Sequence, residues 1–193
     1  EMKNLRMTSD QERWDRKYTA GEGPAHFRPK RFLTEHRHLL GGGRALDVAC
    51  GFGGNALYLA SLGYQVDAVD VSSVAVARAR AEALRRDLAL NLFQADLSRW
   101  RVPAARYDLI VVFYYLNRDL MPRLAAGVRP GGLLVQAIRI RRFVSDRPGF
   151  APDYLLEPGE LRRLACAAGL DVRTYADGAP GEEHNSYLVA QKP

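Results

Sequence analysis

Three carboxylates and a glycine-rich stretch are spaced so that they could bind one ligand that contains a nucleoside. Asp47 lies within an apolar run, Asp70 ends the next apolar run, and Asp96 follows the third. Between the first two lies CGFGGNA, where Gly51 and Gly53 lack a side chain that would keep a ligand from the backbone. A carboxylate about twenty residues after such a loop accepts hydrogen bonds from ribose hydroxyls. The pattern therefore predicts ribose binding by Asp70, with a cation at Asp47 and an adenine amino group at Asp96.

Two ligands that contain a nucleotide or nucleoside fit this loop. GFGGNA satisfies the G-x-G-x-x-A fingerprint of dinucleotide-binding folds, so an NAD(P)-dependent oxidoreductase is one alternative. Asp47 argues against it, because a dinucleotide fold usually has an apolar residue inside the first strand. The sequence also contains no Tyr-x-x-x-Lys pair for hydride transfer. An ammonium, a ribose and an adenine in one molecule describe S-adenosylmethionine, which we take as the predicted ligand.

Alternating elements must position these residues. Strands are predicted at 44–49, 64–70, 90–94, 107–113, 132–138, 170–175 and 186–191, and helices at 54–62, 72–87, 118–127 and 158–168. RPGG at 129–132 predicts a turn. Near-continuous apolar strands such as YDLIVVFYYL are typical of a parallel sheet that is buried on both faces. The segment before the last strand is too short for a helix, so a doubly wound α/β fold with an antiparallel final pair is predicted.

The first forty-three residues predict a polar, helical cap. One helix in SDQERWDRKYTAG is expected to begin at Ser9 or Asp10 and to end at Gly21. A second in PKRFLTEHRHLLGGG is expected to begin at Pro29. Behind the glycines, Asn55 is expected to cap the helix at 54–62.

Composition and charge restrict the class of protein. A chain of 193 residues is expected to form one domain, residues 1–193. The net charge of +6 is spread over several predicted helices without a basic run that interleaves with aromatic residues, so nucleic-acid binding is disfavoured. No apolar run approaches the ~20 residues of a membrane span, and the polar N-terminus is unlike a secretory signal. We therefore expect a cytoplasmic protein with a small-molecule substrate and no membrane association, while the sequence leaves its oligomeric state open.

The two cysteines, Cys50 and Cys166, are both expected to pack in the interior. Neither has a partner at metal-ligand spacing, and two cysteines do not make a disulfide scaffold. No metal site is predicted.

These motifs resemble those of the class I S-adenosylmethionine-dependent methyltransferases. The resemblance is carried by ALDVACGFGGNALYLASLGYQVDAVDVS, FQADL and YDLIVVFYYLNRDLMPRLAAGVRPGGLLVQ. More narrowly, ERWDRKY, CGFGGNALYLASLGY and FYYLNRDLMPRL resemble the tellurite-resistance branch and the thiopurine-like small-molecule methyltransferases near it. The resemblance implies a Rossmann-like, seven-stranded sheet of order 3-2-1-4-5-7-6, with strand 7 antiparallel. It also implies that residues 1–43 form a lid on a core of residues 44–193.

The resemblance further implies a donor site at the strand ends. Asp47 would bind the ammonium group, Asp70 the ribose and Asp96 the adenine amino group. The complete set that the resemblance and the helix cap suggest for the cofactor is Asp47, Ala49, Cys50, Gly51, Gly53, Asn55, Asp70, Val71, Ala95, Asp96, Leu97 and Phe113. Nitrogen methyltransferases that act on adenine or glutamine carry Asn/Asp-Pro-Pro-Tyr/Phe after the fourth strand. This chain has FYYLN there, which disfavours those two substrates.

Acceptor-side residues are expected in the loops at the strand ends and in the cap. One of Arg139, Arg141 and Arg142 in QAIRIRRF would clamp an anionic acceptor, because a guanidinium matches an oxyanion with two donors; a solvated loop is the alternative. Tyr114 follows the fourth strand, and His184 precedes the last one as a candidate base or substrate contact.

Methyl transfer by in-line displacement is the predicted reaction, with a thiol, a metalloid oxyanion or a similar small molecule as acceptor. Such a reaction mainly requires that the two reactants are positioned and that water is excluded. Three alternatives stay open: an RNA or protein methyltransferase, an NAD(P)-dependent oxidoreductase, and a non-catalytic domain that binds S-adenosylmethionine.

Overall fold

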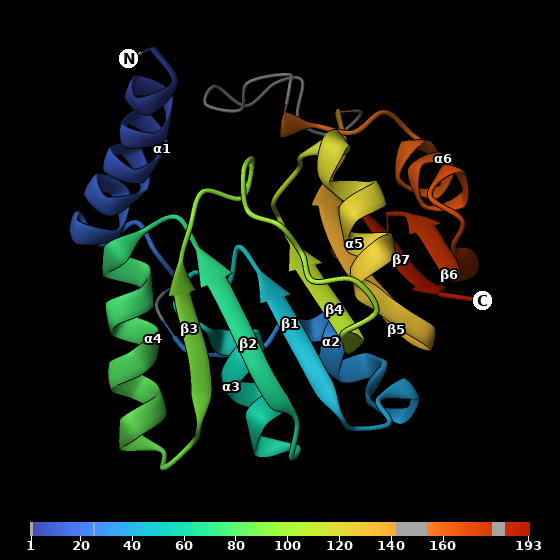
Figure 1. Cartoon of the computed structure of the whole chain (residues 1–193), viewed down its shortest axis with the longest axis horizontal. Coiled ribbons are helices and arrows are strands. Elements are labelled where there is room, and N and C mark those ends of the chain that lie inside the picture. Colours follow the sequence, from blue (N-terminus) through green and yellow to red (C-terminus); the bar gives the residue numbers. More distant parts are fainter. Residues whose placement is uncertain (1, 25, 142–153, 179–183) are drawn as a thin grey trace. The chain divides into compact units, whose positions relative to one another are not determined.

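The computed structural model describes residues 2–24, 26–141, 154–178 and 184–193. Its seven strands follow the order β3-β2-β1-β4-β5-β7-β6, which confirms the predicted topology. The chain separates into two compact units, Glu1–Arg101 and Val102–Pro193, and each is described by itself below (Figure 1).

The first unit contains three parallel strands in the order β3-β2-β1. They are β1 (Arg44–Val48), β2 (Gln65–Asp70) and β3 (Leu90–Gln94). Helix α3 (Gly54–Ser61) packs on β2, and α4 (Ser73–Arg85) packs on β3. Because β1 and β2 are almost wholly buried, their apolar side chains form the core of this unit. The parallel order brings the carboxyl ends of all three strands to one edge of the sheet.

The N-terminal part of this unit is helical, as predicted, but its boundaries differ. Helix α1 covers Met2–Thr19, so Ser9 and Asp10 lie inside it and do not start it. The preceding segment is rich in Met, Lys, Leu and Arg, which favour helix and extend it toward the N-terminus. The second predicted helix is split into α2 (Arg31–Glu35) and the 3-10 turn η1 (Arg37–Leu39). The C-terminal end of α1 lies against the N-terminal end of α4, as Figure 1 shows.

The second unit contains four strands in the order β4-β5-β7-β6. They are β4 (Tyr107–Phe113), β5 (Val128–Arg139), β6 (Asp171–Asp177) and β7 (Asn185–Gln191). β4 and β5 are parallel, whereas β7 runs antiparallel to both β5 and β6, which confirms the predicted antiparallel final pair. The helical elements are η2 (Arg118–Leu120), α5 (Met121–Gly127) and α6 (Glu160–Ala167).

Two predictions for this unit are wrong. The turn predicted at 129–132 is part of β5, because Gly131 and Gly132 pair with Lys192 and the irregularity is absorbed as a register shift against β4. Cys166 is exposed rather than buried, since α6 buries the stripe of Leu161 and Ala165 and Cys166 lies one position beyond it. Across the described residues no helix is both long and apolar enough to cross a membrane.

Candidate functional site

The loop between β1 and α3 has a backbone that requires glycine. Gly51 and Gly53 have φ angles of 53° and 78°, and Ala49 adopts a φ of 55° as well. A Cβ at Gly53 would lie 3.0 Å from the Cβ of Ala79, so a side chain there would be both strained and crowded. A non-glycine residue in the left-handed region, such as Ala49, is characteristic of functional loops. The loop therefore presents bare backbone at the carboxyl end of β1, as the glycine pattern predicts.

Asp70, the last residue of β2, is held in one orientation by this loop. Its Oδ2 accepts a hydrogen bond from Gly51 N at 2.8 Å, and its Oδ1 accepts one from Ser72 N at 2.9 Å. The residue is only 5% exposed. Burial raises the pKa of the Asp70 carboxyl, although the bonds from Ser72 and Gly51 oppose that rise. Each oxygen keeps a second lone pair, so the pair of oxygens fits the two adjacent hydroxyls of a ribose.

Asp47 lies deeper than Asp70, in the middle of β1, and is 1% exposed. Its Oδ2 accepts a hydrogen bond from Ala56 N at 3.0 Å, so it caps the first turn of α3. Burial raises the pKa of Asp47 to about 8. A nearby ammonium group would favour the charged form. The residue thus combines a structural role that sequence reasoning missed with the predicted cation-binding role, which stays a prediction.

The predicted cap by Asn55 is wrong. The N-cap of α3 is Gly53, which makes no side-chain cap bond. Asn55 lies inside the helix, where its Oδ1 accepts a hydrogen bond from Lys30 N at 2.8 Å. Asp47 has taken over the capping function, and Asn55 instead ties the segment before α2 to α3.

The predicted adenine-binding residues lie beside Asp70. Gln94, which precedes Ala95, pairs in register with Asp70, and Ala95 N donates to the Asp70 carbonyl at 2.9 Å. Asp96 Oδ1 accepts a hydrogen bond from Ser98 N at 2.9 Å. Leu97 is buried beneath this turn. The structure therefore places residues 95–97 at the same sheet edge as Asp70 and its neighbour Val71.

An aromatic cluster from α1 and the following loop covers the glycine loop. The Tyr18 ring lies 4.9 Å from that of Phe52 and 5.5 Å from that of Trp14, and Phe27 lies 6.2 Å from Phe52. The Tyr18 hydroxyl would be 3.4 Å from a Cβ at Gly51. Burial raises the pKa of Tyr18 well above its usual value, and Asp70 and Cys50 add to the rise. Tyr18 therefore presents a protonated hydroxyl to the loop, while His26 is exposed.

The contact between α1 and α4 depends on Asp15, whose role no sequence motif indicates. The Asp15 carboxylate accepts hydrogen bonds from the Ser72 and Ser73 hydroxyls and from Val74 N, the last two at 3.0 and 3.2 Å. Ser72 is 57 residues away along the chain, so no local pattern reports the contact. The same Ser72 also donates its backbone N–H to Asp70. Ser72 therefore links α1, through Asp15, to Asp70, the residue that is predicted to bind the ribose.

The second unit holds the predicted acceptor-side residues. Phe113 ends β4 and is buried, and Tyr114 follows it with a φ of 61° and an exposure of 40%. The guanidinium carbon of Arg139 lies 5.5 Å from the centre of the Tyr114 ring, an ordinary cation–π distance. The structure thus brings Tyr114 and Arg139 together. His184 pairs through its carbonyl with Ile140 N at 3.0 Å, and its catalytic role stays a prediction, as does the donor contact of Phe113.

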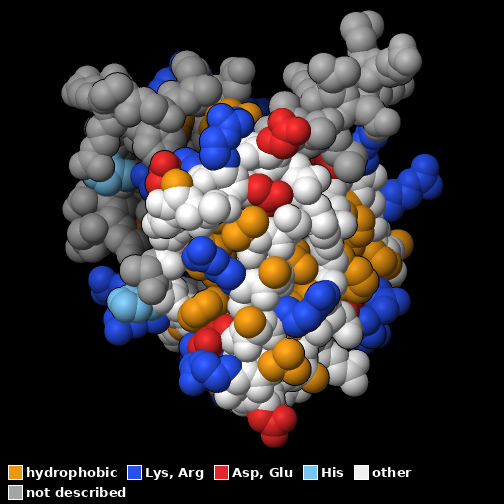
Figure 2. Space-filling view, turned by 90° about the vertical axis from the view of Figure 1, so that its left-hand side faces the viewer, with side chains coloured by type: hydrophobic (Ala, Val, Ile, Leu, Met, Phe, Trp, Pro, Cys, Tyr) orange, Lys and Arg blue, Asp and Glu red, His pale blue; other side chains and the backbone are white. Residues whose placement is uncertain are grey.

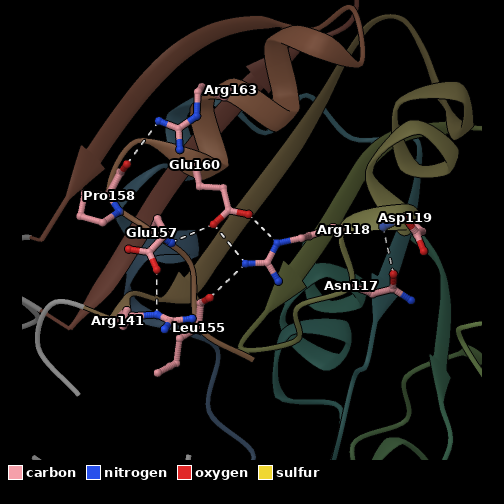
Figure 3. Close-up of polar contacts among 9 residues, drawn as sticks. All are labelled: Asn117, Arg118, Asp119, Arg141, Leu155, Glu157, Pro158, Glu160 and Arg163. Atoms are coloured by element: carbon pink, nitrogen blue, oxygen red, sulfur yellow. Dashed lines mark hydrogen bonds and ion pairs between the residues drawn. The ribbon is translucent and has the colours of Figure 1, made fainter. Parts of the chain in front are cut away.

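A polar network joins the segment before α6 to η2 and to the end of β5, where Leu156 N donates to the Arg139 carbonyl at 2.9 Å (Figure 3 shows the side chains of the network). Arg118 donates to both carboxylate oxygens of Glu160 and, at 3.1 Å, to the Leu155 carbonyl. Burial raises the pKa of Glu160, but the bonds from Arg118 and from Glu157 N outweigh it, and the pKa lies below its usual range. Arg141 forms an ion pair with Glu157 at 2.7 Å. Of the three arginines predicted to clamp an acceptor, Arg141 is in this ion pair, Arg139 contacts Tyr114, and Arg142 lies outside the described residues, so the clamp stays a prediction.

Charge on the outer surface is mixed. Figure 2 shows basic, acidic and hydrophobic side chains interspersed over one face. Exposed apolar side chains of the first unit, such as Leu84 and Phe93, lie among charged ones and are ordinary for a surface. On this face the described basic side chains do not gather into a single patch.

Comparisons with known proteins agree with this geometry. Residues 45–132 match the family model described as a methyltransferase domain. The chain is 34% identical over 165 residues to Hemagglutinin 1 of Eikenella corrodens, an alignment that covers 78% of this chain and 55% of that protein. A solved S-adenosylmethionine dependent methyltransferase from Mesorhizobium loti has the same fold, with a TM-score of 0.72, 19% identity, and coverage of 86% of this chain and 100% of that one.

The fold, the loop and the family model define a class: the chain carries a class I S-adenosylmethionine-dependent methyltransferase domain. Within that class, one relative is the probable S-adenosyl-L-methionine-dependent methyltransferase TehB of Haemophilus influenzae. It is 30% identical over 89 residues, which cover 45% of this chain and 31% of that protein. The chain thus spans about half the length of the first relative and less of the second.

Proposed function

We propose that this domain transfers the methyl group of S-adenosylmethionine to a small, anionic acceptor. The observation that carries the proposal is Asp70, whose two oxygens are aligned by Gly51 N and Ser72 N beside a bare glycine loop. When bound, S-adenosylmethionine supplies a sulfonium methyl group: the acceptor's lone pair forms the new bond to carbon in line as the S–C bond breaks, its electron pair stays on sulfur, and any acceptor proton is released to solvent.

The first unit would hold the donor. Asp70 would accept hydrogen bonds from the ribose hydroxyls, and the turn of residues 95–97 would frame the adenine. Tyr18 would donate its hydroxyl to the amino-acid end of the donor, because its pKa keeps it protonated at the rim of the glycine loop. Asp47 would attract the ammonium group from below. In this scheme residues 1–43 act as a lid of a single methyltransferase domain, as the aromatic cover of Phe52 supports.

The second unit would bind the acceptor. Arg139 would pair with the acceptor's negative charge, held in place by the Tyr114 ring. A thiolate or a metalloid oxyanion is already nucleophilic, so this proposal does not require His184 to act as a strong base. The resemblance to the tellurite-resistance branch favours the same acceptors.

Titration calorimetry tests the donor half of this proposal. S-adenosylmethionine and S-adenosylhomocysteine should bind and NADH should not. Asp70→Ala should weaken both adenosyl ligands at least about tenfold, because hydrogen bonds to a charged group contribute about 1.5–3 kcal/mol. Asp171→Ala, an exposed carboxylate at the start of β6, is the matched control and should leave the affinity unchanged. Tighter binding of NADH, or an Asp70→Ala affinity within about twofold of the parent, would refute the assignment.

A screen with a labelled methyl donor tests the transfer itself. Thiols, selenium and tellurium oxyanions, halides and small phenols are the acceptors to compare. Turnover with at least one small acceptor is expected, and Arg139→Gln should raise the KM of an anionic acceptor without changing donor affinity. Donor binding without turnover on any of them would support a non-catalytic binding domain instead.

A further inference from the structure

A buried amide at the edge of the second unit has an unused hydrogen-bonding end. Asn185, the first residue of β7, is 7% exposed. Its Nδ2 donates to the Tyr187 hydroxyl at 3.0 Å, whereas its Oδ1 has no hydrogen-bond partner among the described residues. Turning the amide over would exchange the two ends and leave the other one unpaired. Buried side-chain polar atoms usually have a partner, so an unpaired one in a folded protein calls for an explanation, and a hydrogen bond to a bound ligand is one.

Asn185 lies opposite Arg139. The two residues are paired in the antiparallel β5–β7 ladder, and such pairs have Cβ atoms about 4.5–5.5 Å apart on the same face of the sheet. Ala137 and Tyr187 form the next pair on that face, and Phe113 is in register with Ala137. One face of the strand ends therefore carries Phe113, Arg139 and Asn185 in succession.

The opposite face is covered by α5 and α6. Val112, Gln136 and Ile138 point there and line a small cavity together with Leu124 of α5 and Leu161 of α6. Side chains alternate along a strand, so Asn185 and Arg139 point away from these helices. The unpaired amide oxygen is thus not part of the hydrophobic packing of α5 and α6.

We propose that Asn185 and Arg139 together bind the methyl acceptor, and that the acceptor is a small anion that also carries an O–H or N–H group. Arg139 pairs with the negative charge, and the amide oxygen of Asn185 accepts the hydrogen bond. The inference rests on the proposed function and narrows its substrate class. Because Arg139 and Asn185 are directly opposite each other, a single small molecule that carries both the negative charge and the O–H or N–H group can reach the two side chains at once.

Asn185 acts here as a specificity-determining residue. An amide does not take up a proton, so it selects the acceptor without serving as a base. A site that hydrogen-bonds a substrate hydroxyl discriminates against an analogue without it, because its own buried polar group is then left unpaired. The Tyr114 ring, stacked with the Arg139 guanidinium, keeps the cation at this edge of the sheet.

Three benzoate probes separate the two interactions in the unmodified protein. 3-Hydroxybenzoate has both the charge and the donor, 3-methoxybenzoate has the charge alone, and 3-hydroxybenzamide lacks the charge. Each is titrated into the full chain by NMR, with and without S-adenosylhomocysteine. 3-Hydroxybenzoate should bind about 3- to 10-fold more tightly than either analogue and should shift the side-chain amide signals of Asn185. Equal affinities for the hydroxy and methoxy probes, or no shift at about 10 mM, would overturn the proposal.

Variants localise the effect. Asn185→Leu should abolish the preference for the hydroxy over the methoxy probe and leave the affinity for S-adenosylhomocysteine unchanged. Gln191→Leu, at the other end of the same strand, is the matched control and should keep the preference. A preserved preference in Asn185→Leu would overturn the proposal; should that variant not fold, the probe comparison in the parent protein still decides. Failure of S-adenosylhomocysteine binding would count against the donor site alone, so the two proposals fail separately.

Discussion

Replacing Asp15 by alanine removes the contact that holds the N-terminal helix to α4. The carboxylate accepts hydrogen bonds from two serine hydroxyls and from Val74 N at the N-terminal end of α4. A capping side chain is worth about 0.5–2 kcal/mol, and a negative charge at a helix N-terminus adds about 0.3–1 kcal/mol. We therefore expect Asp15→Ala to lower the free energy of unfolding by about 1–3 kcal/mol. For a chain of this size each kcal/mol corresponds to about 2–4 °C in Tm.

The loss of unfolding free energy in Asp15→Ala should become smaller as the pH falls. Burial raises the pKa of Asp15, but the bonds from Ser72, Val74 and Ser73 outweigh it, so the pKa is lowered in the folded protein. The folded state therefore favours the charged carboxylate, and its contribution is present at neutral pH. It disappears as the pH falls below the usual carboxyl range and through the lowered pKa. Parent and variant should converge in acid.

Urea unfolding at several pH values measures this difference. A double-mutant cycle with Ser73→Ala isolates the bond at 3.0 Å and should give a coupling of about 0.5–1.5 kcal/mol. Asp10→Ala, on the same helix and in an exposed ion pair with Arg13, is the matched control and should change stability by less than about 0.5 kcal/mol. Because α1 also carries Tyr18, Asp15→Ala should weaken S-adenosylmethionine several-fold. An unfolding energy equal to that of Asp10→Ala, or no coupling to Ser73, would refute the reasoning.

Two further changes test the glycine loop and the carboxylate beneath it. Gly54→Ala would put a Cβ 2.3 Å from the Arg28 carbonyl oxygen, so we expect the free energy of unfolding to fall by about 1–3 kcal/mol. Gly41→Ala, where a Cβ meets nothing within 4 Å, is the control and should change the Tm little. Equal Tm values for the two variants would contradict this packing. Asp47 has its pKa raised from 3.8 to about 8, so the folded state holds the proton more tightly and stability should fall as the pH rises through that window. Asp47→Asn should flatten this fall in urea titrations at pH 5 and pH 9 while it weakens the donor; an unchanged slope would disprove the burial argument.

The fold was predictable because its signals are local. Apolar runs of strand length, with helical stretches between most of them, give the parallel sheet, and the short spacing before Asn185 leaves room only for an antiparallel last strand. Asp70 could be found because a strand end and a glycine loop lie about twenty residues apart in the sequence. These features depend only on neighbours along the chain, and the structure has the predicted strand order and Asp70 at the end of β2.

The errors and omissions arise from contacts between distant segments. Asn55 has the residue type of a helix cap, but Asp47 reaches the same helix from the strand below and makes a cap by Asn55 unnecessary. Asp15 lies in a polar helix, and only the packing of α1 against α4 gives it a role. Asn185 has an unremarkable sequence context, because the unpaired amide oxygen exists only once β5 and β7 align.

The fixed orientation of Asp70 has a consequence for which sugars the site accepts. Backbone N–H groups hold both carboxylate oxygens before any ligand arrives, so little rotational freedom of that side chain is lost on binding. A 2′- or 3′-deoxy analogue would leave one oxygen of a rigid, desolvated carboxylate facing a hydrogen-free carbon. In the proposed donor site, the rigidity of this acceptor pair would therefore select a ribose with both vicinal hydroxyls, whereas a more mobile aspartate at the same place would tolerate their loss.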